Sequence, residues 1–186
     1  MPETYRLFWA VNLPEDMKAV LARLQDRLRH PALDAKWVEQ ENLHLTLKFL
    51  GETEAATVTA LVDAVRERVS GSGSVLLELC RCGTFGRPPR VLWVGVQGDV
   101  PRLRAVHERV EEACRPLGFE PETRGFSPHL TLARLRAAGR GLPREVAAAA
   151  AAVGSLGTLS VTSIELMRSR LSPRGPVYSV LASVNL

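Results

Sequence analysis

Cysteine and lysine are scarce in this sequence, and long apolar segments are missing. The three cysteines, Cys80, Cys82 and Cys114, are few and odd in number, so they indicate a reducing compartment and no disulfide framework. No window approaches the roughly 18 apolar residues of a membrane-spanning helix, and the N-terminus has no basic leader followed by an apolar block. We therefore expect a soluble, cytoplasmic protein that does not associate with membranes.

The basic residues are almost all arginines. Lysine and arginine together number 24, only three of them lysine, and the formal net charge is +4. Arginine presents a planar fork that binds phosphate oxygens two at a time. The composition therefore agrees with an anionic substrate, although a solvated arginine surface is the more frequent cause of such a composition.

Several common catalytic and metal-binding patterns are absent. Cys80-x-Cys82 has no second cysteine pair to complete a zinc site, so these thiols are interpreted as buried small side chains. There is no Gly-x-Ser-x-Gly elbow and no phosphate-binding glycine-rich loop in its required context. With 186 residues and 46% hydrophobic content, the chain is long enough for one bilobed domain over 1–186.

One short motif occurs twice. "NLHLTLKFLG" (42–51) and "SPHLTLARLR" (127–136) share the core His-Leu-Thr-Leu, 85 positions apart. A single histidine on a predicted strand is usually a core residue. The repetition favours a functional interpretation of His44 and His129.

The elements around the two motifs recur in the same order. In each half, apolar periodicity predicts a strand, an amphipathic helix, an extended link and the histidine-bearing strand: 6–13, 15–29, near Trp37 and 42–51, then 91–96, 100–116, 119–124 and 129–134. Trp9 precedes His44 by 35 residues, and Trp93 precedes His129 by 36. This agreement indicates an internal duplication with two lobes related by a rough two-fold axis.

Further elements complete the predicted order. Helices are expected at 53–69 and 144–153, a loop at 136–143, and extended segments at 157–168 and 176–185. "SRLSPRG" between the last two is predicted to be a turn, flanked by Arg168, Arg170 and Arg174. This hairpin completes one sheet and either brings those guanidinium groups to a site or leaves them in solvent.

Strand alternation places each histidine beside its threonine. Side chains two apart share a face, so His44 and Thr46 point away from Leu45, and His129 and Thr131 point away from Leu130. A two-fold relation then brings both polar faces into one cleft. Imidazole both takes and gives a proton near neutral pH, and threonine hydroxyls are suited to phosphoryl oxygens. The four residues together predict acid–base catalysis at phosphorus.

The remaining histidines have simpler interpretations. His30 lies at the end of the first predicted helix, where a partial positive charge is favourable. His107 lies on the helix at 100–116, and a packing role at its boundary is expected. A metal site is not favoured, because neither motif brings a carboxylate or a second histidine at the required spacing.

The sequence resembles the two-histidine phosphoesterases, and within them the bacterial and archaeal RNA 2′,3′-cyclic phosphodiesterases once called 2′-5′ RNA ligases. The resemblance spans nearly the whole chain and depends on "LFWAVNLP", "WVEQENLHLTLKFLGE", "GTFGRPPRVLWVGV", "GFSPHLTLARLR" and "ELMRSRLSPRGPVYSVL". It implies an α+β, bilobed fold, in which two antiparallel sheets flanked by helices enclose a central cleft.

The resemblance also implies roles. His44 would be the general acid that protonates the leaving 3′ oxygen, His129 the general base that activates water, and Thr46 and Thr131 the phosphate ligands. The product would be an RNA end with a 2′-phosphate, and neither a metal nor another cofactor would be needed.

Two further positions are implied with alternatives. Phe8 matches a position that lines the base pocket in relatives, but a plain core role is as well supported. Arg134 matches an arginine that approaches the phosphate, yet it has the parity of Leu130 and Leu132 and should point away from His129. Only a bulge, a twist or an early strand end would turn Arg134 toward the cleft.

Three functions remain open at this point. The first is hydrolysis of 2′,3′-cyclic phosphate ends of RNA or nucleotides by a monomeric enzyme. The second is a non-catalytic adaptor that binds terminal phosphates of RNA. The third, 2′-5′ ligation, is the reverse of the hydrolytic step.

Overall fold

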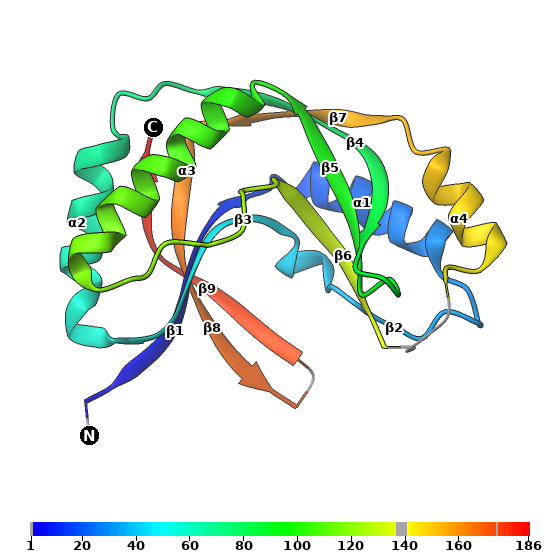
Figure 1. Ribbon diagram of the computed structural model, residues 1–186, viewed down its shortest axis with the longest axis horizontal. Helices are drawn as coiled ribbons and strands as arrows, with labels where there is room; N and C mark the ends of the chain where they lie inside the picture. The colour runs from blue at the N-terminus through cyan, green and yellow to red at the C-terminus, as the bar shows by residue number, and fades with distance from the viewer. Residues whose placement is uncertain (1, 137–140, 174) are drawn as a thin grey trace.

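The fold is an antiparallel sheet flanked by four helices, as seen in the computed structural model, which describes residues 2–136, 141–173 and 175–186 (Figure 1). Among these residues the strand order is β7-β4-β5-β6-β3-β1-β8-β9, and β2 pairs with β6. The strands are β1 (Thr4–Asn12), β2 (Ala35–Trp37), β3 (His44–Glu54), β4 (Val75–Phe85), β5 (Val91–Gly98), β6 (His129–Leu135), β7 (Ser155–Val161), β8 (Ser163–Ser172) and β9 (Gly175–Asn185). The helices are α1 (Glu15–Leu28), α2 (Val58–Val69), α3 (Val100–Cys114) and α4 (Arg144–Ala151).

The sheet consists of two halves that touch at one point. The first half contains β3, β1, β8 and β9, and the second contains β6, β5, β4 and β7. The only pairing between β3 and β6 within the described residues is that of Leu45 with Leu130. The two histidine strands therefore meet at the centre and diverge on either side, which confirms the expected bilobed α+β fold.

Each repeat places its first helix on the opposite half. α1 follows β1 in the chain but packs near α4 and β7, behind the second half. α3 follows β5 but packs against α2 and β3, behind the first half. Figure 1 shows α2 and α3 together on one side of the molecule and α1 and α4 on the other. The duplication is thus interlocked, because each half of the sheet is covered by a helix from the other repeat.

The core lies between these helices and the faces of the two halves that they cover. Leu45 and Leu130 are fully buried there, together with Trp9 and Leu92. Burying one leucine side chain stabilises a fold by about 1.5–3 kcal/mol, so the leucines of the two motifs hold the histidine strands in place. The alternation predicted from the sequence is thereby confirmed for these leucines. None of the described helices has the length and apolar character of a membrane span.

Several expected elements differ from the structure. Sequence analysis assigned no strand to 75–85, which is β4. The segment expected as one unit at 157–168 is two strands, of which β7 pairs with β4 and β8 with β1, in different halves. Residues 119–124, expected to be extended, form no strand. Residues 137–140 of the expected loop and Arg174 of the expected turn lie outside the described residues.

Candidate active site

The two motifs line one cleft on the face opposite their leucines. The cleft has a volume of about 570 Å³ and is lined by His44, Thr46, His129 and Thr131 among others. Small-molecule sites typically measure about 300–1,000 Å³, so a nucleotide-sized ligand fits. Across the Leu45–Leu130 pair, antiparallel register sets His44 toward the position of Thr131 and Thr46 toward that of His129. The structure therefore brings the four predicted residues together.

Both imidazole rings are oriented by the same hydrogen bond. Nδ1 of His44 lies 2.7 Å from the carbonyl oxygen of Asn42, and Nδ1 of His129 lies 2.8 Å from that of Ser127. A carbonyl oxygen only accepts, so Nδ1 carries the proton in each ring. Nε2 is then the atom whose protonation changes, and it is the atom available for chemistry on a ligand.

His44 lies between aromatic rings and contacts Thr46 of the same motif. Its ring centroid is 5.0 Å from that of Phe8 and 5.3 Å from that of Tyr178, and Nε2 lies 2.9 Å from Oγ1 of Thr46. Burial lowers the pKa of His44 below its ordinary 6.5, the hydrogen bond to Asn42 opposes this, and nearby His129 and Lys18 lower it further. The neutral ring accepts the Thr46 hydroxyl proton at Nε2.

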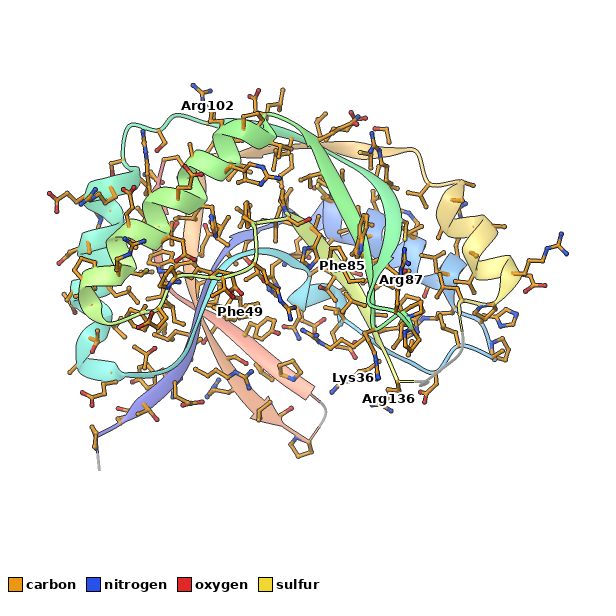
Figure 2. All side chains as sticks on the ribbon, in the orientation of Figure 1. Lys36, Phe49, Phe85, Arg87, Arg102 and Arg136 are labelled. Carbon is orange, nitrogen blue, oxygen red and sulfur yellow. The ribbon has the colours of Figure 1, made fainter. Side chains whose placement is uncertain are left out.

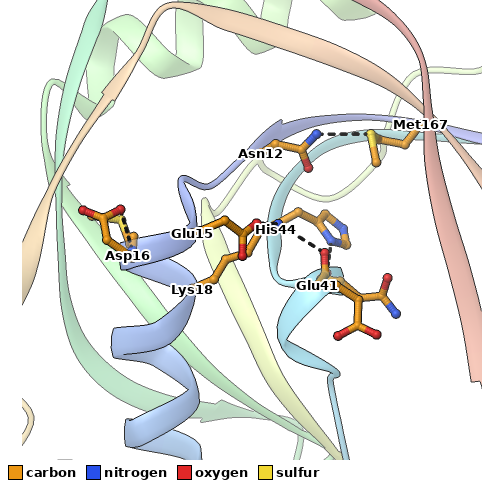
Figure 3. Close-up of polar contacts among 9 residues, drawn as sticks. Asn12, Glu15, Asp16, Lys18, Glu41, His44 and Met167 are labelled. Carbon is orange, nitrogen blue, oxygen red and sulfur yellow. Dashed lines mark hydrogen bonds and ion pairs between the residues drawn. The ribbon is translucent and has the colours of Figure 1, made fainter.

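The segment that precedes His44 is held from two sides. Nζ of Lys18 lies 3.4 Å from the backbone oxygen of Glu41 and 2.9 Å from Oε1 of Glu15. Figure 3 shows Glu15, Lys18 and Glu41 close to His44. Asn42 donates from Nδ2 to the carbonyl oxygen of Pro176 in β9, at 2.8 Å. These bonds fix the carbonyl that orients His44.

His129 has an aromatic neighbour of its own. The ring of Phe85 meets the imidazole edge-on with centroids 4.8 Å apart, and Phe85 also contacts Trp93 at 5.2 Å. Gly83 leaves room for this arrangement, because a Cβ at that position would lie 2.5 Å from the Trp93 ring. Figure 2 shows Phe85 and Phe49 on the two halves of the molecule.

A bulge in each histidine strand changes the side-chain parity. In β6, Trp93 pairs with Thr131 and Leu92 with Ala133, so Leu132 is an extra residue. In β3, Ala10 pairs with Thr46 and Trp9 with Lys48, so Leu47 is the equivalent extra residue. A bulge of this kind re-aims the residues beyond it.

The bulges turn two equivalent residues into the cleft. Arg134 follows His129 by five positions and Phe49 follows His44 by five, and both line the cleft. The simple parity that pointed Arg134 away is therefore wrong, and the bulge named as one exception is present. Phe8 also lines the cleft, although only 3% of it is exposed, so it serves both the cleft and the packing beneath it.

The cleft carries more positive than negative charge. Arg6, Lys36 and Arg134 line it, against one carboxylate, Glu39. Lys36 and Arg134 are direct cross-strand neighbours, an arrangement of like charges that destabilises a sheet. No ion pair is formed by either side chain with another described residue. These cations are available to a bound anion.

Sequence reasoning missed several of the residues that line the cleft. Tyr178 contacts both Phe8 and His44, and burial raises the pKa of its phenol while Arg134 and Arg6 oppose that rise. The five-residue spacing after each histidine was a signal that could have identified Phe49. No sequence signal pointed to Tyr178.

Arg168 and His107 do not line the cleft and contact other aromatic rings instead. The Arg168 guanidinium lies 3.7 Å from the centroid of the Tyr5 ring, and so it stacks beside the first half. His107 packs flat on Phe126 with centroids 4.1 Å apart, which agrees with its expected packing role. Within the described part of the chain, no three His, Cys, Asp or Glu side chains form a cluster that could hold a metal ion.

Comparison with known proteins matches the chain to one phosphoesterase family, both by the family model and by individual relatives. Residues 11–93 and 94–178 match the family described as LigT like Phosphoesterase, one match for each repeat. RNA 2′,3′-cyclic phosphodiesterase of Aeropyrum pernix is 40% identical over 176 residues, which cover 88% of this chain and 93% of the relative. The protein of that name from Methanothermobacter thermautotrophicus is 32% identical, with coverage of 94% and 95%.

Solved structures agree with the fold. A protein of Thermus thermophilus matches with a TM-score of 0.80 and 30% identity over 97% of both chains. Escherichia coli LigT complexed with 3′-AMP matches with a TM-score of 0.83 and 25% identity over 99% of both chains.

Proposed function

The chain belongs to the LigT-like phosphoesterase family, and from this premise we propose that it hydrolyses 2′,3′-cyclic phosphate ends of RNA or nucleotides to 2′-phosphomonoesters. One observation carries the proposal. Two imidazoles from separate repeats line one cleft, and each has its Nδ1 proton bound to a backbone carbonyl, which leaves Nε2 for proton transfer. Such a pair serves as acid and base in one reaction.

The proposed step is an in-line displacement at phosphorus. His129 removes a proton from water through Nε2 as the water oxygen attacks phosphorus. The bond between phosphorus and the 3′ oxygen breaks, and protonated His44 donates its Nε2 proton to that oxygen. The reaction uses no metal in this proposal, and each histidine ends in the protonation state in which the other began.

The contact between His44 and Thr46 supports the role of the acid. When His44 is neutral, the Thr46 hydroxyl donates to its Nε2, 2.9 Å away. When His44 is protonated, Nε2 donates instead, and the hydroxyl proton is released toward a phosphoryl oxygen. Thr131 stands in the equivalent position of the second motif, so the two hydroxyls would hold the two non-bridging oxygens.

Charged and aromatic side chains of the cleft would bind different parts of the substrate, the phosphate and the base. Arg134 and Lys36 would bind the phosphate, since a dianionic product or its transition state neutralises their mutual repulsion. Phe8, Phe49 and Tyr178 surround the His44 side, with Phe8 and Phe49 ring centroids 6.0 Å apart. Phe49 is 61% exposed at the cleft, and stacking of a base on it compensates for that exposure.

We also propose a cytoplasmic location and a monomeric active form. Cys80, Cys82 and Cys114 are free thiols, which supports a reducing, cytoplasmic compartment. Both histidines come from one chain, which supports a monomer as the active form.

The test is incubation with a nucleoside 2′,3′-cyclic phosphate in the presence of EDTA, followed by identification of the phosphate isomer. A 2′-phosphate product supports the proposed roles. A 3′-phosphate product would exchange the leaving oxygen and contradict them, and tight binding without turnover would instead favour an RNA-end adaptor. Ligation, in which a 5′-hydroxyl instead of water attacks the cyclic phosphate, is measured by the same assay with a free 5′-hydroxyl end added.

A further inference from the structure

Two buried polar groups behind the cleft connect the repeats to each other. Gln25 of α1 is 3% exposed, and its Nε2 donates to the carbonyl oxygens of Val38, at 2.8 Å, and Leu132, at 3.0 Å. Val38 belongs to the segment that leads into His44. Leu132 is the bulged residue of β6, three positions after His129. Gln25 therefore joins the approach to one histidine with the strand of the other.

The second repeat contains an equivalent connection, made by a buried ion pair instead of an amide. Lys48 of β3 is 3% exposed, and its Nζ donates to Oε2 of Glu111, at 2.7 Å, and to the carbonyl oxygen of Glu120, at 2.9 Å. Lys48 directly follows the bulged Leu47. Glu120 lies in the segment that leads into His129. The Lys48–Glu111 pair thus joins the approach to His129 with the strand of His44.

The equivalence of the two connections follows from the helix pattern. Every buried residue of α1 has a buried counterpart at the same spacing in α3, which also buries Val106 and Ala113: Met17, Leu21, Leu24, Gln25 and Leu28 correspond to Leu103, His107, Val110, Glu111 and Cys114. Gln25 and Glu111 occupy the same position. Lys48 is four residues after His44, and its counterpart four residues after His129 is Ala133. One connection uses an amide and the other an ion pair for the same task.

We propose that Gln25 and the Lys48–Glu111 pair are positioning groups that set the relative placement of His44 and His129. The inference uses the proposed function only for its kinetic test. Each imidazole is oriented by a carbonyl two residues before it, in the segment that one of these groups holds. That segment is tied to the opposite histidine strand, so a change at either connection displaces both rings relative to each other.

The burial of these groups supports a positional role over a simple contribution to stability. A buried ammonium ion is costly to desolvate, and an apolar pair of similar size is often as stable or more so. The side chains of Lys48 and Glu111 are only 2% and 11% exposed. A group retained in spite of that cost is explained by the geometry that it imposes. A displacement of about 1 Å of a catalytic group costs up to about 100-fold in rate.

The experiment compares Gln25→Leu, Lys48→Ala and the double variant Lys48→Ala/Glu111→Gln with the wild type. Leu159→Ala is the matched control, because it opens a cavity in the edge strand β7 and Leu159 takes part in none of the hydrogen bonds of either connection. Hydrolysis of a nucleoside 2′,3′-cyclic phosphate gives kcat and KM, thermal unfolding gives Tm, and NMR gives the ring signals of both histidines. The double variant gives positions 48 and 111 the residue types of their counterparts in the other connection, Ala133 and Gln25.

We expect Gln25→Leu and Lys48→Ala to lower kcat by about 10- to 100-fold, with KM within about threefold. The double variant should recover most of the lost kcat, and Leu159→Ala should lower Tm with kcat unchanged. Both histidine ring signals should move in the two single variants, and neither should move in the control. Single variants that fold with wild-type kcat and unmoved ring signals would refute the positioning role.

The remaining outcomes are also decisive. A double variant as slow as Lys48→Ala would refute the equivalence of the two connections. If the wild type fails to hydrolyse the cyclic phosphate, the proposed function falls, and the ring signals alone then decide the positioning role. Ring signals that move in Leu159→Ala as much as in the two single variants would show a general loss of packing and would refute the positioning role.

Discussion

Replacement of the two histidines tests whether they act as one unit. His44→Ala and His129→Ala should each slow hydrolysis by about 10²–10⁴-fold, the usual contribution of one general acid or base. That loss corresponds to about 3–5 kcal/mol of barrier. Both side chains serve the same displacement in one cleft, so the double variant should lose about as much as the slower single variant, and far less than the product of both losses.

The structure limits how much of this effect can come from unfolding. Removing His44 takes an aromatic partner from Phe8 and Tyr178, whose ring centroids lie 5.0 and 5.3 Å away. Such ring contacts contribute about 0.5–1.5 kcal/mol each beyond their area. For a chain of 186 residues, about 1 kcal/mol lowers Tm by about 2–4 °C. The barrier effect therefore exceeds the stability effect, and the variants should remain folded.

The assay follows conversion of a nucleoside 2′,3′-cyclic phosphate by ³¹P NMR, with Tm measured on the same samples. His30→Ala is the matched control, since His30 lies outside the cleft and donates no bond to it; its Nδ1 accepts from the amide of Ala32. Its rate should equal that of the wild type. A folded His44 or His129 variant that retains more than a tenth of the wild-type rate would refute paired acid–base catalysis.

Three other predictions concern ionisable side chains, two in the cleft and one outside it. The pKa of His44, followed by NMR, should lie below 6.5 in the free protein and rise when a nucleoside 2′-phosphate is added; an unchanged pKa would place the phosphate away from its ring. Burial lowers the pKa of His107 as it does that of His44, so the unfolded chain binds more protons below pH 6.5, and the free energy of unfolding should fall as the pH drops through that window. His107→Leu, which copies the equivalent Leu21, should flatten this decline in urea titrations, and an equally steep decline would contradict the assignment. Arg134→Ala should raise KM by about 10- to 100-fold, the value of a charge-assisted hydrogen bond, and an unchanged KM would separate the guanidinium from the phosphate.

The central residues of the site were predictable because strand alternation is a strict rule. His44 and Thr46 share a face with no further information, and Leu45 must then face the core. The repetition of the motif with its flanking elements predicted that His129 and Thr131 form the other wall. The structure places all four on one cleft, as the period of two required.

The positions beyond the motif were not predictable by the same rule. A bulge inserts one residue and reverses the parity of everything after it. The apolar alternation continues unbroken from Leu47 to Phe49, and after Leu132 it is interrupted only by Arg134 itself. Simple alternation therefore places both Arg134 and Phe49 on the wrong face, and only the resemblance to the family favours Arg134 as a site residue. Comparing the two repeats at five residues after each histidine would have linked these two side chains before the structure was known.

The exchange of helices between the repeats was also beyond sequence analysis, and the reason is general. An apolar stripe shows which face of a helix is buried, but it does not show which sheet covers it. The apolar stripes of α1 and α3 therefore do not by themselves select one half of the sheet. The polar members of those stripes, Gln25 and Glu111, are the exception, because a buried polar group needs a specific partner. Each has a partner on the histidine strand of the other repeat, Leu132 for Gln25 and Lys48 for Glu111. These two polar residues in otherwise apolar stripes are therefore where the sequence encodes the interlocking of the two halves.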